Sequence, residues 1–486
     1  ELGEDAGRRR FAGLWQVTLF GGVGCLLAFD GVRFYFSYTL MTFAGYGLVI
    51  HSLDAAALQA GRIYMILGVI GEGILLVALL LVGPLVPGLP LADLPAAVAA
   101  TPWRDTIAVL VLVGFGIKMG LLPLHIWLPV AHTQAPVPAS ALLSGLLIKL
   151  GLLGWLRFLP LGSAELTVLG SWMMTLGAVG ALYAAAMGVC QRRAKAVLAY
   201  SSLSQMGLVS LVLGIALQVP QAWGSLGAIL LFFAFHHGLA KAALFLGAGL
   251  ALGGSRWAAG LVFIPALALV GAPLTSGLLA KDLLKEAVTL APGDWKTLLT
   301  ASLNASTGAT ALLMARFLYL IRQTPAKAAT QEGWVLGTLG TMLVASLTLP
   351  WLWAATQMGA VAGFELSVGN LATAVLGRLD QWGGFVAPVA VATLLATAVV
   401  LASGGRLLFA IPEGDILPAL LKGASAVGRV IARLRAAAEG AAMPGGRPSM
   451  LLGPLEVFEG ALARWYYGGL AWMAVLLIAL VALAWR

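Results

Sequence analysis

Six ionisable side chains interrupt long apolar stretches of this sequence. If such a stretch lies in a bilayer, each charged group costs about 2.5–3.5 kcal/mol on insertion scales, so a function is expected wherever one is found. Lysine, histidine and glutamate can exchange protons when a protein tunes their surroundings. We therefore predict that these side chains form a proton pathway: Glu72, Lys118, Lys149, His236, His237 and Lys241.

His237 and Lys241 give the clearest spacing within this set. They are four residues apart, which puts both on one face of a helix about one turn from each other, so a proton could pass between them through one water molecule. A buried lysine can release its proton near neutral pH, and a carboxylate close by favours the protonated form. Changing the distance between Glu72 and a lysine would therefore switch that lysine between holding and releasing its proton.

Four further ionisable residues are possible accessory members of the pathway. Each lies near the end of an apolar stretch or beside prolines, where a packing role, a loop role or a charged end reaching the membrane surface explains it nearly as well. The accessory candidates are His125, His132, Lys281 and Asp282.

The elements that must hold these groups are membrane helices. The 486 residues are 60% hydrophobic and 10% charged, a balance that a soluble domain of this size does not need. Apolar stretches close to the ~20 residues that cross a bilayer recur from about Leu14 to Trp485, and a window of that length predicts about 13 transmembrane helices. Prolines after Lys118 and at Pro265 and Pro273 predict broken helices, which are typical of ion pathways.

Charge and cysteine content exclude other classes. The net charge of +9 comes from loops between apolar stretches and not from a basic, aromatic-rich patch, so no nucleic acid is expected as a partner. Most of these loop residues fall on one side if the helices alternate, which predicts a cytoplasmic N-terminus. The two cysteines, Cys25 and Cys190, are far apart, so neither a metal cluster nor a disulfide framework is expected. The sequence shows no Walker loop, haem pair or cysteine cluster, so no bound cofactor is expected.

The chain divides into five predicted regions. Within residues 416–443, apolar residues recur at helical spacing beside a basic side, which predicts a helix lying at the cytoplasmic surface against lipids or a partner subunit, or else a solvated loop. The regions are an N-terminal part with two membrane helices (1–60), a proton-translocating core (61–322), C-terminal membrane helices (323–410), a cytoplasmic or interfacial amphipathic segment (411–462) and a final membrane helix (463–486).

Four motifs resemble one known superfamily. The stretch GFGIKMGLLPLHIWLPVAHTQAPVPASALLSGLLIKLGLLGWLRF is similar to the signature of the antiporter-like subunits of respiratory complex I, Mrp antiporters and membrane-bound hydrogenases. Three others follow in the family's order: RRAKAVLAYSSLSQMG, FHHGLAKAALFLGAG and GAPLTSGLLAKDLL. The resemblance covers about residues 60–322 and implies two inverted five-helix repeats, each with a broken helix.

The resemblance also implies roles for single residues. Lys118 matches the lysine of the broken helix, Lys149 the connecting lysine, and His237 with Lys241 the second half-channel. The family's usual glutamate is missing near Thr39, and Glu72 is the candidate substitute. A second departure lies in residues 301–320, where the family tends to carry a lysine or glutamate and this chain has Asn304, Thr307 and Arg316.

The predicted function is a proton-conducting subunit of a multi-subunit energy-coupling complex in a bacterial or organellar inner membrane. No catalytic centre is expected in the chain itself, so partner subunits would supply the energy, as in complex I or a hydrogenase. Three alternatives stay open. They are a subunit that admits protons to a soluble enzyme in a two-component inorganic-carbon uptake system, a non-conducting scaffold that anchors partners, and a Na⁺/H⁺ antiporter.

Overall fold

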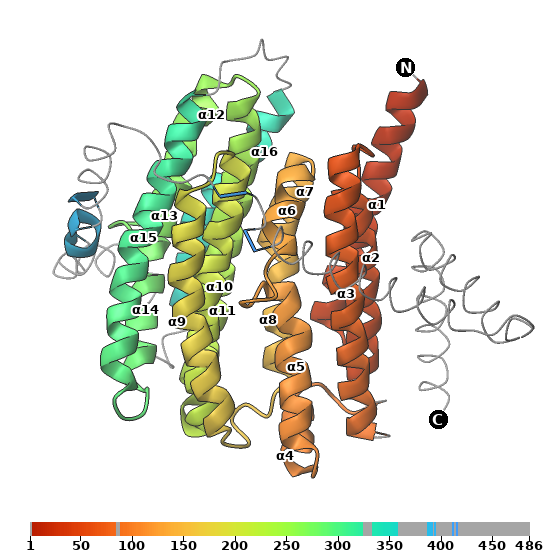
Figure 1. Cartoon of the computed structure of the whole chain (residues 1–486), viewed down its shortest axis with the longest axis vertical. Coiled ribbons are helices and arrows are strands. Elements are labelled where there is room, and N and C mark those ends of the chain that lie inside the picture. The colour runs from red at the N-terminus through yellow and green to blue at the C-terminus, as the bar shows by residue number, and fades with distance from the viewer. Residues whose placement is uncertain are drawn as a thin grey trace, which may run out of the picture.

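The structure is a computed structural model that describes residues 2–83, 88–323, 333–357, 386–391, 393–394, 411–412 and 415–416. Within these residues the chain forms helices and no strand, as the composition predicts. Most helices run nearly along one axis, with α1 to α3 at one side of the bundle, α5 and α8 in the middle, and α13 to α15 at the other side (Figure 1).

The helices follow one another with short connections, as expected for a bundle of membrane-length segments. Their bounds are α1 Leu2–Leu27, α2 Gly31–Val49, α3 Ala55–Val82, α4 Leu94–Ala100, α5 Arg104–Met119, α6 Trp127–Gln134, α7 Val137–Leu142, the π-helical turn η2 Leu143–Leu147, α8 Ile148–Phe158, α9 Thr167–Val189, α10 Ala194–Gln218, the 3₁₀ turn η3 Pro220–Ala222, α11 Trp223–Leu252, α12 Arg256–Leu261, α13 Phe263–Val270, α14 Ser276–Thr289, α15 Trp295–Gln323 and α16 Gly333–Gln357.

The chain is a multi-pass membrane protein. Eight helical segments of the described residues are long and apolar enough to cross a bilayer. Shorter apolar pieces such as α5 and α13 belong to interrupted helices, which a length criterion passes over. The predicted all-helical membrane fold is confirmed, whereas the total of 13 spans stays a prediction. The interfacial segment and the final membrane helix lie almost wholly outside the described residues, as does most of the region 323–410.

Helix α10 forms the centre of the bundle. The whole of its membrane-length window is buried, and it packs against α9, α11 and α15. Four serines and a glutamine lie among its buried residues, where each needs a hydrogen-bond partner because water is excluded. These polar groups are Ser201, Ser202, Ser204, Gln205 and Ser210.

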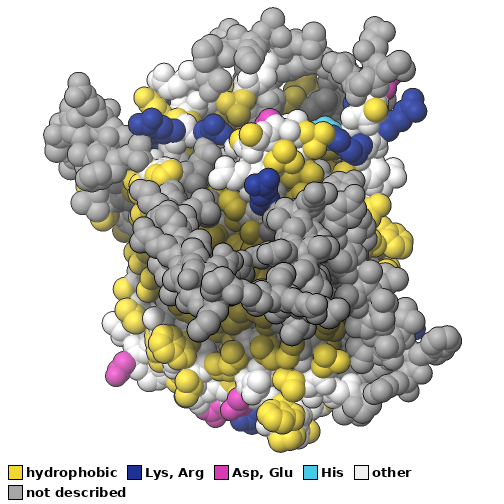
Figure 2. All heavy atoms as spheres, turned by 45° about the vertical axis from the view of Figure 1, so that its right-hand side comes forward, with side chains coloured by type: hydrophobic (Ala, Val, Ile, Leu, Met, Phe, Trp, Pro, Cys, Tyr) yellow, Lys and Arg dark blue, Asp and Glu magenta, His cyan; other side chains and the backbone are white. Residues whose placement is uncertain are grey.

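Basic residues collect at one end of the bundle. Arg8, Arg9 and Arg10 begin α1, and the alternation of the helices brings Arg192 and Arg193, between α9 and α10, to the same end. Figure 2 shows Lys and Arg side chains gathered near the upper end of the molecule, where Figure 1 marks the N-terminus. The prediction of a cytoplasmic N-terminus rests on such a collection of basic residues at one side of the membrane.

Glycines allow α9 and α10 to approach very closely. A Cβ atom on Gly177 would lie 2.5 Å from the Leu211 nitrogen, and one on Gly207 would lie 2.6 Å from the Ala181 nitrogen. The same contact repeats two turns along, between Gly170 and Gly214. Small residues at matched positions are typical of membrane helices whose backbones touch, so α9 fixes the position and rotation of α10.

Replacing Gly207 with alanine should separate these helices and destabilise the protein by about 1–3 kcal/mol, because the new methyl group has no room. The thermal midpoint of the detergent-purified protein measures the effect. Gly224→Ala is the matched control, since nothing lies within 4 Å of a Cβ at that helical position. Equal midpoints for the two variants would contradict the close contact.

Candidate functional site

Lys118 lies in the last turn of α5, directly before an interruption of the helix. Gly120 ends α5 with φ +77°, a backbone conformation that favours glycine, and the chain resumes as helix only at α6. The indole nitrogen of Trp127 donates a hydrogen bond to the Ile117 carbonyl at 2.7 Å. The break therefore leaves Lys118 beside a backbone carbonyl whose hydrogen bond is supplied by a side chain of the protein. An interrupted helix inside a membrane requires such internal hydrogen bonds.

The Lys118 ammonium is enclosed by α2 and α3. Its Nζ donates to the Thr42 hydroxyl at 2.9 Å and lies 3.5 Å from the Tyr64 hydroxyl. It also lies 5.0 Å from the centre of the Tyr64 ring and 5.5 Å from that of Tyr38. Two aromatic faces and a hydroxyl stabilise a cation in a site that is closed to lipid.

Glu72 projects from α3 toward the same face of α2. The Thr39 hydroxyl donates a hydrogen bond to the Glu72 carboxylate, and Thr39 is the residue near which the family's glutamate was missing. The other carboxylate oxygen has no hydrogen-bond partner in the structure. Glu72 thus brings a carboxylate from α3 to the surface of α2, one helical turn from the hydroxyl that holds Lys118.

Lys149 sits beside a second kind of helix irregularity. The turn η2 is a π-helix between α7 and α8, and π-turns release a carbonyl from the regular hydrogen-bond pattern. The Lys149 ammonium donates to the Ser144 carbonyl of that turn. Neutral backbone therefore supplies the hydrogen bond, and no described carboxylate pairs with Lys149.

Two serines connect Lys149 to Lys241. The Ser144 hydroxyl lies 2.8 Å from the Ser202 hydroxyl, which donates to the Leu198 carbonyl at 3.1 Å. Lys241 Nζ donates to that same carbonyl at 2.7 Å. A short series of hydrogen bonds thus runs from the Lys149 turn across α10 to the fully buried Lys241 on α11.

The two adjacent histidines of α11 face different surroundings. His236 Nδ1 hydrogen bonds with the Ser276 hydroxyl at 2.8 Å, at the start of α14 and just past the break that follows α13. His237 is fully buried, stacks on Phe233, and has no hydrogen bond at either ring nitrogen. A buried imidazole without a partner is typical of a site that a water molecule or a moving proton completes.

Lys281 differs from its sequence interpretation. The sequence suggested the end of a span or a charged loop, but the residue lies within α14, 7% exposed and without a hydrogen bond at Nζ. The break after Gly271 explains this, because the chain re-enters as a new helix instead of leaving the bundle. The carboxylate of the next residue, Asp282, lies 3.5 Å from the Lys285 ammonium.

His132 lies between the basic end of the bundle and the buried lysines. Its ring is fully buried, stacks 4.8 Å from that of Phe245, and interacts electrostatically with Lys195, Lys241 and Lys149. Lys195 itself donates to the Ala135 carbonyl at 2.5 Å, just after α6. Its position makes His132 a stronger candidate than its place in the sequence suggested.

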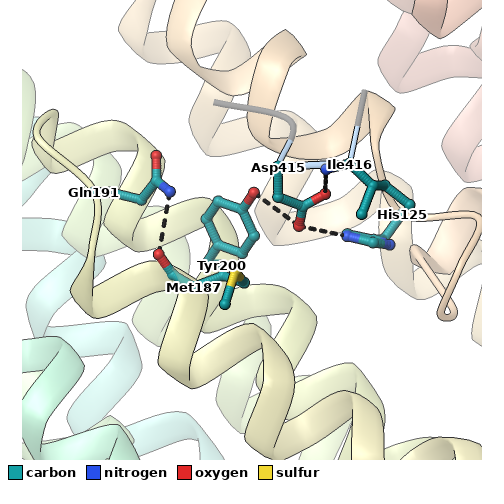
Figure 3. A network of polar contacts seen from close by, with 6 residues as sticks. All are labelled: His125, Met187, Gln191, Tyr200, Asp415 and Ile416. Carbon is teal, nitrogen blue, oxygen red and sulfur yellow. Dashed lines mark hydrogen bonds and ion pairs between the residues drawn. The ribbon is translucent and has the colours of Figure 1, made fainter. Parts of the chain in front are cut away.

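His125 belongs to a separate polar network. Its Nε2 lies 2.9 Å from a carboxylate oxygen of Asp415, and the Tyr200 hydroxyl donates to the same oxygen at 3.1 Å (Figure 3). The His125 and Asp415 side chains are only 1% and 2% exposed. This contact ties a residue far along the chain to the interruption between α5 and α6.

The predicted residues therefore form two groups. Polar contacts join Glu72 and Lys118 to α2 in the first group. In the second, Lys149 interacts electrostatically with His236, His237 and Lys241. Between the described side chains of the two groups, no hydrogen bond is present, so the predicted continuous line stays a prediction.

Sequence reasoning missed the hydroxyl groups that hold the charged ones. Such residues attract no attention in a membrane helix, because serine and threonine can satisfy themselves on the carbonyl four residues earlier. The sequence could have drawn attention to Ser144 and Ser202, because these two residues lie inside the recognised motifs. The missed residues are the hydroxyl-bearing Tyr38, Thr42, Tyr64, Ser144 and Ser202, together with Asp415, whose carboxylate contacts His125.

Solved structures share this architecture. A chain of the Mrp complex from Dietzia sp. DQ12-45-1b superposes with a TM-score of 0.57 at 20% identity, covering 77% of this chain and 79% of that one. A chain of the membrane-bound sulfane sulfur reductase, an archaeal respiratory membrane complex, gives 0.60 at 19% identity and covers 74% and 77%. At these identities the likeness establishes the fold alone.

Curated relatives are similar over shorter stretches. Hydrogenase-4 component B of Escherichia coli (strain K12) is 32% identical over 238 residues, which cover 47% of this chain and 35% of that protein. The chloroplastic NAD(P)H-quinone oxidoreductase chain 4 of Adiantum capillus-veneris is 33% identical over 245 residues, covering 50% and 48%. The chain thus matches about a third to a half of the length of these relatives.

The family comparison covers more of the chain. The family described as "NADH:quinone oxidoreductase/Mrp antiporter, TM" matches residues 28–308, which include both groups of buried ionisable residues. This match spans more than half of the sequence and agrees with the fold and with the four motifs. The chain therefore belongs to the NADH:quinone oxidoreductase/Mrp antiporter family of antiporter-like membrane subunits.

Proposed function

We propose that this chain is a proton-conducting subunit of a multi-subunit energy-coupling complex, in which protons move through the buried ionisable groups and intervening water. The observation that carries the proposal is the hydrogen-bonded pair of hydroxyls, Ser144 and Ser202, that lies between Lys149 and Lys241, with each lysine donating to a backbone carbonyl beside that pair. Each lysine donates to a backbone carbonyl, which only accepts. Water molecules would therefore connect each amine to the two hydroxyls, which both donate and accept and so can pass a proton between them.

The first group supplies a charge switch. Glu72 and Lys118 hydrogen bond with Thr39 and Thr42, one turn apart on α2, and these two described side chains form no ion pair. A small rotation of α2 or movement of the α5 break would change the distance between carboxylate and ammonium. The shift in their interaction would favour holding the proton on Lys118 or releasing it.

The second group supplies the relay. Its described members are all bases, so each positive charge disfavours a second one nearby. A proton that arrives at one lysine therefore promotes release from the next. His132 connects this group toward the basic end of the bundle, which we assign to the cytoplasmic side of an inner membrane.

Partner subunits complete the proposed mechanism. Relatives include Hydrogenase-4 component B, Formate hydrogenlyase subunit 3 and a quinone oxidoreductase chain, all named as components of larger assemblies. We expect this chain to take its driving energy from an analogous redox partner. Peripheral partners and lipids would bind outside the ionisable core.

Proton flux is the direct test. Lys118→Ala and Lys241→Ala should each lower flux by about a hundredfold or more, because each removes a proton carrier that water alone replaces poorly. Flux is measured with a pH-sensitive dye in vesicles containing the chain together with its copurifying proteins. Lys285→Ala, at a half-exposed lysine, is the control and should conduct normally.

Unchanged flux in both lysine variants, with assembly intact, would favour the scaffold alternative. Flux that requires Na⁺ would favour an antiporter, and a soluble carbon-converting enzyme among the copurifying proteins would favour the uptake system.

Ser202→Ala should lower flux by about tenfold, since it removes a hydroxyl that spans the gap between the two lysines. Ser210→Ala is a closely matched control. Ser210 lies two turns along the same helix, is 1% exposed, and also donates to the carbonyl four residues earlier. If both variants lose flux equally, the serine bridge has no special role.

Glu72→Ala should reduce flux by about tenfold or more, because no other described carboxylate reaches the Lys118 pocket. Adding Thr39→Glu to that variant should restore much of the flux, since Thr39 already contacts the native carboxylate. The same vesicle assay reports both. If Thr39→Glu does not restore flux in a well-assembled protein, a carboxylate at this place is not sufficient to explain the role of Glu72.

A further inference from the structure

A cavity of about 700 Å³ opens beside Lys149. It is lined by α1, by the α7 to α8 segment, by α11 and by α16, and nearly all of its wall is apolar. Exposed lining residues such as Leu26 and Leu231, 50% and 46% exposed, mark its mouth at the surface of the described bundle. A volume in the range of roughly 300–1,000 Å³ is typical of sites that take small organic ligands.

The cavity lies at the level of the bilayer interior. Lys149 is near the middle of the membrane-length segment Val137–Phe158. The molecules that can reach this mouth are therefore those that dissolve among lipid chains. A phospholipid headgroup is too strongly hydrated for this depth.

Among the described residues that line the cavity, Lys149 is the one charged residue. Its ammonium donates to the Ser144 carbonyl, and it makes no ion pair in the structure. Two of its potential hydrogen bonds are thus available, because an ammonium has three donors. Gly238 lets α11 approach the π-helical turn beside Lys149, since a methyl group at that position would lie only 2.9 Å from the Gly145 carbonyl oxygen.

We propose that this cavity binds a long-chain fatty acid, with the carboxyl group at Lys149 and the tail along Leu146, Phe235 and Met342. The neutral acid would enter from the lipid when Lys149 has released its proton, and it would protonate that amine, which yields a carboxylate paired with an ammonium. The apolar walls match the tail of a fatty acid, and the Lys149 cation matches its carboxylate. A fatty alcohol has no charge to pair with Lys149, and the positive charge of a fatty amine would be repelled by it.

The consequence for transport rests on the proposed function. A bound carboxylate would hold the proton on Lys149 and so interrupt its exchange with Ser144 and Ser202. Fatty acids would then act on this chain as inhibitors that arrive from the membrane.

Trp15 lines the cavity and provides a binding signal. The protein in lipid nanodiscs is titrated with stearic acid brominated along its chain, and tryptophan fluorescence is followed. We expect saturable quenching that is absent in Trp15→Phe. The signal from Trp15 is the difference between the native protein and this variant, because the chain has 15 tryptophans. Lys149→Met, which keeps the bulk and removes the charge, should weaken binding by about tenfold or more.

Three controls define the site. Brominated stearyl alcohol should bind the native protein as weakly as the acid binds Lys149→Met. Lys285→Met should bind the acid normally, and Ala242→Leu, which fills the cavity from α11, should abolish the saturable signal. Quenching that never saturates, or equal affinity of the acid for native protein and Lys149→Met, would overturn the proposal. Because no flux is measured, either result leaves the proposed conduction to its own test.

Discussion

The structure depends on keeping ionisable side chains inside a membrane protein without leaving them unpartnered. The carbonyls of a regular helix are already bonded within the helix, and each can help only by accepting a second hydrogen bond. Each key lysine therefore lies beside an irregular or accessible backbone group. Lys118 precedes the interruption at Gly120, Lys149 bonds to the carbonyl of the π-turn, and Lys241 uses the Leu198 carbonyl of a neighbouring helix. The apolar bundle thus accommodates charge with a helix interruption, a π-turn and a second hydrogen bond to a carbonyl of the regular helix α10.

The two groups of ionisable residues solve this problem differently. Around Lys118, aromatic rings, hydroxyls and one carboxylate stabilise a cation. Around Lys149 and Lys241 the described partners are neutral hydroxyls and carbonyls, and the remaining ionisable neighbours are bases. The first arrangement suits a group that holds charge, and the second suits groups that give it up. This contrast is what the proposed relay requires.

Close packing of α9 and α10 is what brings the relay together. Ser202 meets Ser144 only if α10 has one particular rotation about its axis, and the glycine contacts with α9 fix that rotation. The Asp415 contact adds a restraint at the other interruption, where it holds His125 between α5 and α6. Contacts outside the two groups of ionisable residues thus determine how those groups are positioned.

The sequence by itself determined the membrane fold, the family and the buried ionisable residues, because hydrophobic length and the cost of charge in lipid depend on local composition. Proline and glycine positions also indicated where helices would break. Only the tertiary structure decided that Glu72 reaches Thr39, that Ser202 meets Ser144, that Lys281 lies inside a helix, and that Asp415 meets His125. Those contacts join helices distant in sequence, and their pairing depends on the rotation and packing of each helix, which no local pattern specifies.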